Sequence, residues 1–396
     1  MQANWREIAT AFDHKKNFVL ATIIKTCGAT YQKAGAMMLI NQQGDCVGLL
    51  SGGCLEADIS LYAKQVLQDK QSQVIRYDLS ADADLLWGLG LGCDGAIDIL
   101  LQPLLASNQH LGFGVLLKYV KAQQTGYYLQ NIPLNASLNT QQKPLKDKKQ
   151  INKPFAKFVL SEQLDYQKID VRKTDGKKID SQKIKLTAES EHNTQLCIIT
   201  PIKPPINLLI CGAGPDVVPV AKFAEQMGWQ VTLWDHRKAH LQQQHFNDYQ
   251  QRCVRAKNTC ISDYSMFDAA IVMTHNLVMD SEYLAKLIAT PVTKLNYIGL
   301  LGPKARRDKL LKACEFELSQ VQHRVYGPVG LNLGGRGAQA IALSMISEIQ
   351  QHFYTQSSFK QYNEQSILCS LCCLKDVELT KANVKSRSVY SGVDCV

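Results

Sequence analysis

The feature that most constrains the fold is an apolar strand, Asn207–Cys211, that runs directly into the glycine-rich turn Gly212-Ala213-Gly214-Pro215-Asp216. Apolar residues at helical spacing follow the turn, and a second strand then ends at Asp235. A strand, a glycine turn, a helix and a second strand in this order are typical of a doubly wound parallel sheet. Strands at 269–273 and 295–298, each followed by a helix, continue the pattern. We therefore expect a Rossmann-like α/β domain over residues 206–353.

The sequence also places candidate ligand-binding residues at one edge of this sheet. Ligands of open α/β sheets bind beyond the carboxyl ends of the strands, where Gly212, Gly214, Asp235 and His275 would converge. Asp235 lies 23 residues after Gly212, close to the spacing typical of an acid that binds a ribose 2′-hydroxyl. His275 is either a structural histidine or a functional one, which would act as a hydrogen-bond donor or as an acid–base group and not as a metal ligand.

Binding of NAD(P) at this edge stays an alternative, because the glycine fingerprint is imperfect. Val217 stands where the third glycine is expected, which disfavours close packing of the helix around a dinucleotide. Arg237, beside Asp235, would tolerate a phosphate. Arg306 and Arg307, on a later predicted helix, are either a solvated face or a phosphate clamp.

Residues 1–130 show the mixed periodicities of an α+β domain. The spacing of apolar residues predicts strands at 18–26, 36–41, 46–50, 74–78 and 96–101, and helices at 3–15, 54–69 and 107–123. The chain is therefore expected to fold as this α+β domain followed by the Rossmann-like domain.

Ser51-Gly52-Gly53-Cys54-Leu55-Glu56 places a thiol behind two glycines, at the predicted first turn of a helix. Glycines adopt positive φ and turn their N–H groups outward, so Ser51, Gly52 and Gly53 are candidates to hold an anion. The positive end of a helix dipole favours the thiolate, which is the nucleophilic and metal-binding form of cysteine. Cys54 is therefore a candidate catalytic residue and metal ligand. The alternative is a buried cysteine that packs against the glycines.

Composition narrows the class of protein. The chain has 396 residues and a net charge of +9, but residues 143–185 alone hold thirteen Lys and Arg against six Asp and Glu. The basic excess is therefore one segment with few aromatic residues, which indicates a solvated insertion and not a nucleic-acid interface. Thirteen scattered cysteines, with no signal sequence or apolar spanning run, indicate a cytoplasmic protein with mostly reduced thiols and no membrane association.

Two further segments separate or follow the domains. Residues 131–205 are rich in Lys, Gln and Asn and are expected to be a partly ordered insertion and linker, with strands at 155–160 and 195–200. Residues 354–396 form a tail that is expected to be flexible. Its cysteines, Cys369, Cys372, Cys373 and Cys395, lack a second pair at the spacing of a zinc finger, so a zinc site is the less favoured alternative.

The motifs, taken together, resemble the XdhC/CoxI family of accessory proteins for molybdenum hydroxylases such as xanthine dehydrogenase. In the N-terminal half they are Ala21–Thr26 with Gly28, Lys33 with Gly35–Met38, Ser51–Glu56, and Gly92–Gly95 with 97–103. In the C-terminal half they are Gly212–Asp216, Asp235–Arg237, Thr274–Asn276 with Asp280, Gly299–Gly302 and Gly327–Leu331. The sequence departs from the family at Gly334–Ala340, where a Thr-Pro-Glu-Glu stretch is usual.

The resemblance implies a homodimeric chaperone for molybdenum cofactor, either molybdopterin or its cytosine dinucleotide form. Such a protein protects the cofactor while a cysteine desulfurase supplies its terminal sulfur, and then delivers it to an apo-hydroxylase. In that role Cys54 would approach the metal, and the turns at Gly52–Gly53 and Gly92–Gly95 would hold the cofactor phosphate. Cys93 is a second thiol in a glycine turn and is either an assistant or a bystander.

Other functional classes remain open. An NAD(P)-dependent oxidoreductase would use Gly212, Gly214 and Asp235 for the cofactor and His275 as its acid or base. That alternative leaves the Ser-Gly-Gly-Cys element without a role. A structural partner of the hydroxylase that does not touch the cofactor is a third possibility, and the sequence favours a non-catalytic insertion chaperone over an enzyme.

Overall fold

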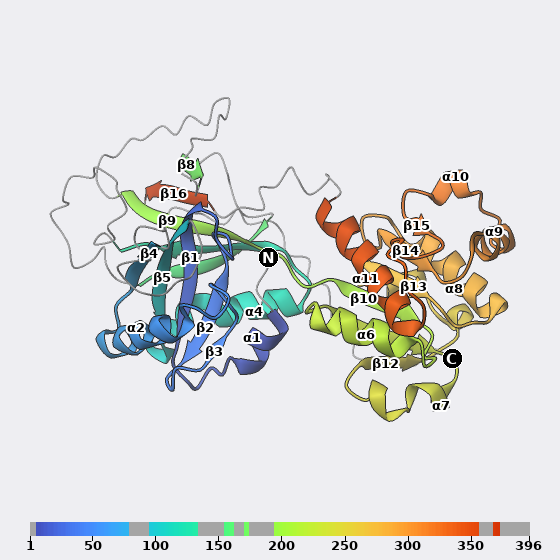
Figure 1. The fold of residues 1–396 in the computed structure, drawn as a ribbon, viewed down its shortest axis with the longest axis horizontal. Helices are drawn as coiled ribbons and strands as arrows, with labels where there is room; N and C mark the ends of the chain where they lie inside the picture. Colours follow the sequence, from blue (N-terminus) through green and yellow to red (C-terminus); the bar gives the residue numbers. More distant parts are fainter. Residues whose placement is uncertain are drawn as a thin grey trace.

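The computed structural model describes residues 5–78, 95–133, 154–161, 170–173, 194–355 and 367–372. The described residues form two lobes (Figure 1). The N-terminal lobe holds two antiparallel sheets, and the C-terminal lobe holds one parallel sheet. The chain passes from one lobe to the other through the short segment between β9 (Thr194–Ile202) and β10 (Asn207–Cys211).

The first sheet of the N-terminal lobe has the strand order β3-β2-β1-β5-β4. Its strands are β1 (Phe18–Gly28), β2 (Met37–Asn41), β3 (Cys46–Val47), β4 (Gln73–Asp78) and β5 (Gly95–Leu104). Alternate residues of β1 enter different cores, because successive side chains of a strand point to opposite faces. Val19 and Ala21 pack with α2 (Glu56–Asp69), whereas Phe18 and Leu20 pack with α1 (Trp5–Ala11) and α4 (Phe113–Lys121).

The second sheet of this lobe has the order β7-β6-β9-β16-β8. Its strands are β6 (Gly126–Asn131), β7 (Ala156–Leu160), β8 (Asp170–Lys173), β9, and β16 (Ile367–Cys372). The strands predicted at 155–160 and 195–200 are therefore present. The tail, for which no strand was predicted, returns to the N-terminal lobe, since β16 pairs with both β9 and β8.

The C-terminal sheet is parallel and has the order β12-β11-β10-β13-β14-β15, the strand order of a doubly wound Rossmann fold. Helices α6 (Val217–Gln226) and α11 (Ala338–Thr355) cover one face, and α8 (Leu277–Ala289) and α9 (Lys304–Ala313) cover the other. The remaining elements are β11 (Gln230–Asp235), β12 (Gln250–Cys253), β13 (Ala269–Val272), β14 (Tyr297–Leu300), β15 (Val325–Tyr326), α7 (Lys238–Leu241), α10 (Leu318–Val321) and the 3₁₀ turns Gln244–Phe246, Ala256–Asn258 and Ile261–Tyr264. The predicted Rossmann-like α/β architecture is confirmed.

Two predicted elements differ from the structure for identifiable reasons. The helix predicted at 107–123 is a 3₁₀ segment, η1 (Ala106–Gly112), followed by α4, because three residues from Gln109 to Leu111 adopt positive φ. Within this turn His110 is buried and its Nε2 lies 3.0 Å from the carbonyl oxygen of Lys16. The strand predicted at 46–50 ends at Val47, because the next residue, Gly48, has a φ of 104° that a strand does not adopt.

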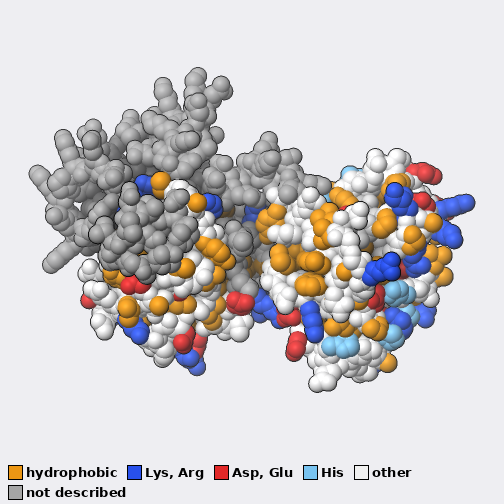
Figure 2. Space-filling view, in the orientation of Figure 1, with side chains coloured by type: hydrophobic (Ala, Val, Ile, Leu, Met, Phe, Trp, Pro, Cys, Tyr) orange, Lys and Arg blue, Asp and Glu red, His pale blue; other side chains and the backbone are white. Residues whose placement is uncertain are grey.

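Charged side chains are intermixed on the face of the C-terminal lobe shown in Figure 2. Both basic and acidic side chains are present on this surface, with apolar side chains between them. Within the described ranges, no helix is both long and apolar enough to cross a membrane.

The tight contact of β10 with β13 predicts which glycine of the sheet cannot be replaced. A Cβ atom on Gly212 would lie 2.5 Å from the carbonyl oxygen of Met273, whereas one on Gly334 would meet nothing within 4 Å. Gly334 has a φ of 78°, in the left-handed region that costs an alanine about 1–2 kcal/mol, and Gly212 has a φ of 133°, which is at least as unfavourable for an alanine. Overpacking adds about 1–3 kcal/mol to Gly212→Ala alone. Urea denaturation should therefore show a larger loss of unfolding free energy for Gly212→Ala than for Gly334→Ala, and equal losses would contradict the predicted contact.

Candidate functional site

One carboxylate organises the Ser51–Glu56 loop. Glu56 Oε1 accepts hydrogen bonds from the backbone N–H groups of Leu50 at 2.9 Å and Ser51 at 2.8 Å. Glu56 Oε2 accepts the Ser51 hydroxyl at 2.5 Å and the N–H of Gly53 at 3.0 Å. Ser51 Oγ in turn accepts the N–H of Leu55 at 2.8 Å. The sequence suggested that the N–H groups of this turn would bind an external anion. Those of Ser51 and Gly53 instead donate to the carboxylate of Glu56.

These hydrogen bonds also determine the ionisation of Glu56. Partial burial alone would raise the pKa of its carboxyl group, but the hydrogen bonds from Ser51 and Leu50 outweigh burial and lower the pKa below its ordinary value. Glu56 is therefore a carboxylate at neutral pH, and its charge also lies in the first turn of α2, where the helix dipole favours it.

The loop presents Cys54 to solvent. The sequence predicts that Cys54 lies in the first turn of this helix. Helix α2 instead begins at Glu56 with Leu55 as its N-cap residue, so Cys54 precedes the helix. Its side chain is exposed, so the alternative of a buried packing cysteine is wrong. The thiol is accessible to a ligand, while the backbone on both sides of it is held by Glu56.

The surroundings of this loop come from two neighbouring segments. A Cβ atom on Gly52 would lie 3.4 Å from the ring of Tyr31, so the ring of Tyr31 lies against the loop. Gly95 begins β5 opposite Gly28, with its Cα so close to Ala29 that a Cβ would lie 2.2 Å from the Ala29 carbonyl oxygen. Gly95 is therefore a close-packing glycine. The other two members of the predicted second turn, Gly92 and Cys93, lie outside the described residues.

In the C-terminal lobe, the buried Asp235 forms a hydrogen bond to the glycine turn. This carboxylate is fully buried and accepts the N–H of Ala213 at 2.8 Å, the N–H of Arg237 at 2.8 Å and the Arg237 guanidinium at 2.7 and 3.0 Å. Burial would raise the pKa of Asp235, but the Arg237 hydrogen bonds outweigh it and lower the pKa. Both oxygens are thus already bonded, and a ribose hydroxyl would have to compete with them. The ribose-binding role stays a prediction that this geometry disfavours.

His275 lies above the glycine turn. It has positive φ and its Nε2 is 2.8 Å from Oδ2 of Asp216, the residue that precedes α6. A Cβ atom on Gly214 would lie 2.6 Å from Oδ1 of Asp216 and 3.8 Å from Cδ2 of His275. A carboxylate of the chain therefore lies at the helix N-terminus where a dinucleotide phosphate would bind. The exposed His275–Asp216 pair is also suitably placed for proton transfer, and that role for His275 stays a prediction.

The arginines on α9 have structural partners. Arg306 pairs with the buried Asp280 at 2.5 Å, and Asp280 also accepts the Thr274 hydroxyl at 2.6 Å. Arg307 donates to the carbonyl oxygen of Gly327 at 2.9 Å. The two arginines join loops at the edge of the sheet and are not an unpaired phosphate clamp.

Two sequence profiles match the two lobes. That of the XdhC and CoxI family matches residues 11–78, and that of the XdhC Rossmann domain matches residues 208–349. Together the matches cover more than half of the chain. The chain belongs to the XdhC and CoxI family.

Two named proteins and one solved structure are similar to this XdhC-family chain. It is 29% identical over 354 residues to a Bacillus subtilis protein described as a probable subunit of xanthine dehydrogenase, and the match covers 86% of this chain and 94% of that protein. It is 31% identical over 97 residues to the molybdenum cofactor insertion chaperone PaoD of Escherichia coli, covering 23% of this chain and 30% of PaoD. A crystal structure of a xanthine dehydrogenase from Bacillus halodurans superposes with a TM-score of 0.67 at 26% identity, covering 91% of this chain and 99% of that one.

The XdhC-family motifs identified the loops but not the side chains that hold them. The Ser51–Glu56 motif alone does not predict that Glu56 holds the loop, although a carboxylate five residues after Ser51 is a sequence signal for this role. The glycine turn does not predict that its last residue, Asp216, pairs with His275. Tyr31 lies outside the motifs. Among the residues that the structure describes, no group of three or more His, Cys, Asp or Glu side chains forms a metal site, so Cys54 stands as a single candidate ligand.

The first prediction for this loop concerns its rigidity. Glu56→Gln leaves one acceptor oxygen in place of two, so some of the N–H groups of Leu50, Ser51 and Gly53 lose their partner. We expect amide hydrogen exchange at these positions to become at least tenfold faster. Asp58→Asn is the matched control. It removes another carboxylate from the first turn of α2, and this carboxylate accepts the Tyr77 hydroxyl and not an N–H group of the loop. Unchanged exchange in Glu56→Gln would refute the role of Glu56.

The lowered pKa of Glu56 predicts a pH dependence. A carboxyl group whose pKa is lower in the folded state stabilises the fold above its unfolded pKa, about 4.3 for glutamate, and loses this contribution as the pH falls toward its folded value. Stability of the wild type measured from pH 6 down to pH 3 should therefore fall more steeply than that of Glu56→Gln. Parallel curves for the two proteins would show that Glu56 does not titrate with folding.

Proposed function

We propose that this chain is an accessory chaperone that binds molybdenum cofactor as cargo and delivers it to a molybdenum hydroxylase of the xanthine dehydrogenase or aldehyde oxidase type. The names of its relatives in Bacillus subtilis and Escherichia coli support this class of function. The observation that carries the proposal is the exposed thiol of Cys54 on a loop whose backbone is held by Glu56. An exposed, positioned thiol has no evident structural purpose, but it is suited to contact a soft metal centre.

The geometry fits cargo that must later be released. A resident metal is usually enclosed by three or four protein ligands. In the described parts of the chain Cys54 has no such companions, so it would contribute a single thiolate contact to molybdenum or to its terminal sulfur. One contact orients the cargo without enclosing it, and the apo-hydroxylase can then displace it by offering a deeper site.

Several finer points belong to the same proposal. We infer that the cargo is held while a cysteine desulfurase supplies its terminal sulfur, that the protein works in the cytoplasm, and that it does so as a homodimer. The cargo is molybdopterin or its cytosine dinucleotide form. Since Glu56 already occupies donors of the Ser51–Gly53 turn, the cofactor phosphate would either compete with Glu56 or bind elsewhere.

An NAD(P)-dependent oxidoreductase is the second candidate, favoured by the Rossmann strand order of the C-terminal lobe. The side chains at the edge of that sheet speak against it. Val217 replaces the third glycine, Asp235 is fully bonded within the chain, and Asp216 lies at the N-terminus of α6. A Rossmann fold by itself does not imply a nucleotide ligand.

The test is an anaerobic titration of the purified protein with molybdenum cofactor, with NAD(H) as the competing ligand. We expect stoichiometric binding of the cofactor, and a dissociation constant at least tenfold higher for Cys54→Ser, because a thiolate contact is lost. Cys260→Ser is the matched control, since Cys260 is also exposed but lies in the other lobe. Tight binding of NAD(H) without uptake of the cofactor would refute the proposal and favour the oxidoreductase.

A further inference from the structure

The C-terminal tail supplies a strand to the N-terminal lobe. Helix α11 ends at Thr355 in the C-terminal lobe, and β16, which begins at Ile367, lies beside β9 in the N-terminal lobe (Figure 1). In the sheet order β7-β6-β9-β16-β8, β16 is inserted between β9 and β8. The tail therefore connects the two lobes, in addition to the segment that leads from β9 to β10.

The register of β16 places two cysteines opposite each other. Cys369 faces Cys197 of β9 across the antiparallel pair, and the register runs without a shift from Ile367 to Cys372. Facing Cα atoms of antiparallel strands lie about 4.5 or 5.5 Å apart. A disulfide joins residues whose Cα atoms are about 4.4–6.8 Å apart. The two positions are therefore within reach of a disulfide without movement of either strand.

The facing positions also share one face of the sheet. Cys197 is fully buried, and the next residue, Ile198, packs with Leu100 of the first sheet. Because successive residues of a strand point to opposite faces, Cys197 belongs to the face of β9 that is turned away from the first sheet. Directly opposite residues of an antiparallel pair belong to the same face, which places Cys369 there too. Cys372, the other cysteine of β16, faces Thr194 across β9.

We propose that Cys197 and Cys369 form a redox-sensitive disulfide that fastens the tail to the N-terminal lobe. The oxidant is a small-molecule disulfide such as glutathione disulfide. One protein thiolate attacks this oxidant, which forms a mixed disulfide and releases one glutathione thiolate. The second protein thiolate attacks the protein sulfur of the mixed disulfide and releases the other glutathione thiolate. The two thiol protons pass to the released thiolates, and the two electrons that the protein loses reduce the oxidant. This inference does not depend on the function proposed above.

The bond changes how the lobes are joined. It closes a covalent loop through residues 198–368, which contains every described strand and helix of the C-terminal lobe. A crosslink across a long loop restricts the unfolded chain, so the oxidised protein is more stable than the reduced one. Among the strands that the structure describes, β8 pairs with β16 alone. A disulfide that fixes β16 therefore also holds β8 in the sheet.

The test is oxidation of the full chain by glutathione disulfide, followed by peptide mapping and non-reducing electrophoresis. We expect a linkage between Cys197 and Cys369, and faster migration of the denatured chain, because the closed loop makes it more compact. Both results should disappear in Cys197→Ser and in Cys369→Ser. They should remain in Cys372→Ser, which is the matched control from the same strand. On oxidation, amide exchange in β8 and β16 should become at least tenfold slower in the wild type and stay unchanged in Cys369→Ser.

A second variant tests the register without altering the buried Cys197. Thr194→Cys, added to Cys369→Ser, puts a cysteine opposite Cys372, and the linkage between β9 and β16 should move to this new pair. A linkage of Cys197 to any cysteine other than Cys369 in the wild type would overturn the proposal. So would the absence of a linkage between β9 and β16 in both the wild type and the double variant.

Discussion

The carboxylate of Glu56 holds the loop that presents Cys54 to solvent in the described part of the N-terminal lobe. Surface loops are usually mobile, and a reactive group on such a loop has no fixed position. Glu56 accepts four hydrogen bonds from Leu50, Ser51 and Gly53, so the backbone is fixed while the side chain of Cys54 stays exposed. The same bonds consume donors that a phosphate would need. The loop is therefore better suited to present sulfur than to bind an anion.

Carboxylates of the chain also hold the glycine turn of the C-terminal lobe. Asp235 bonds to the turn from the buried side, and Asp216 lies at the start of α6 with His275 as its partner. In a dinucleotide-binding domain these positions serve the ribose and the phosphates. Here they are filled by carboxylates of the chain itself. The parallel sheet therefore provides a rigid lobe, and its strand order alone is no evidence for a nucleotide.

Periodicity predicted the elements well where burial alone determines them. The strand Asn207–Cys211 has the predicted bounds because it is buried on both faces. Prediction was poorest where a polar side chain determines the backbone. Glu56 holds the backbone that leads into α2, and the break before α4 accompanies the buried His110. Hydrogen bonds between side chain and backbone leave no periodic signal, so the loops could be located from sequence but not their geometry.

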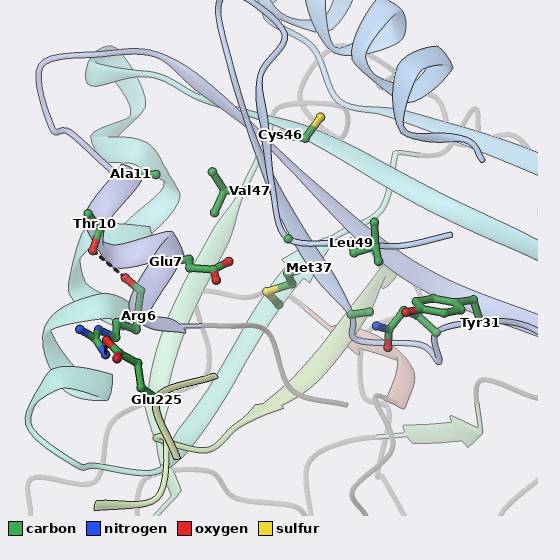
Figure 3. Close-up of a pocket in the computed structure, with 13 residues that line it drawn as sticks. Arg6, Glu7, Thr10, Ala11, Tyr31, Met37, Cys46, Val47, Leu49 and Glu225 are labelled. Atoms are coloured by element: carbon green, nitrogen blue, oxygen red, sulfur yellow. Dashed lines mark hydrogen bonds and ion pairs between the residues drawn. The ribbon is translucent and has the colours of Figure 1, made fainter. Parts of the chain in front are cut away.

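Polar side chains make contacts between the two lobes. Arg6 and Glu225 are both partly exposed, and ion pairs of this kind contribute only about 0–1 kcal/mol to stability. Gln123 and Gln230 form a second polar contact between the lobes at 3.0 Å. Polar contacts of this strength hold the lobes in one arrangement without locking them. Arg6 and Glu225 also line a cavity of about 850 Å³ that Tyr31 borders (Figure 3), so a molecule bound in this cavity would lie against residues that join the lobes.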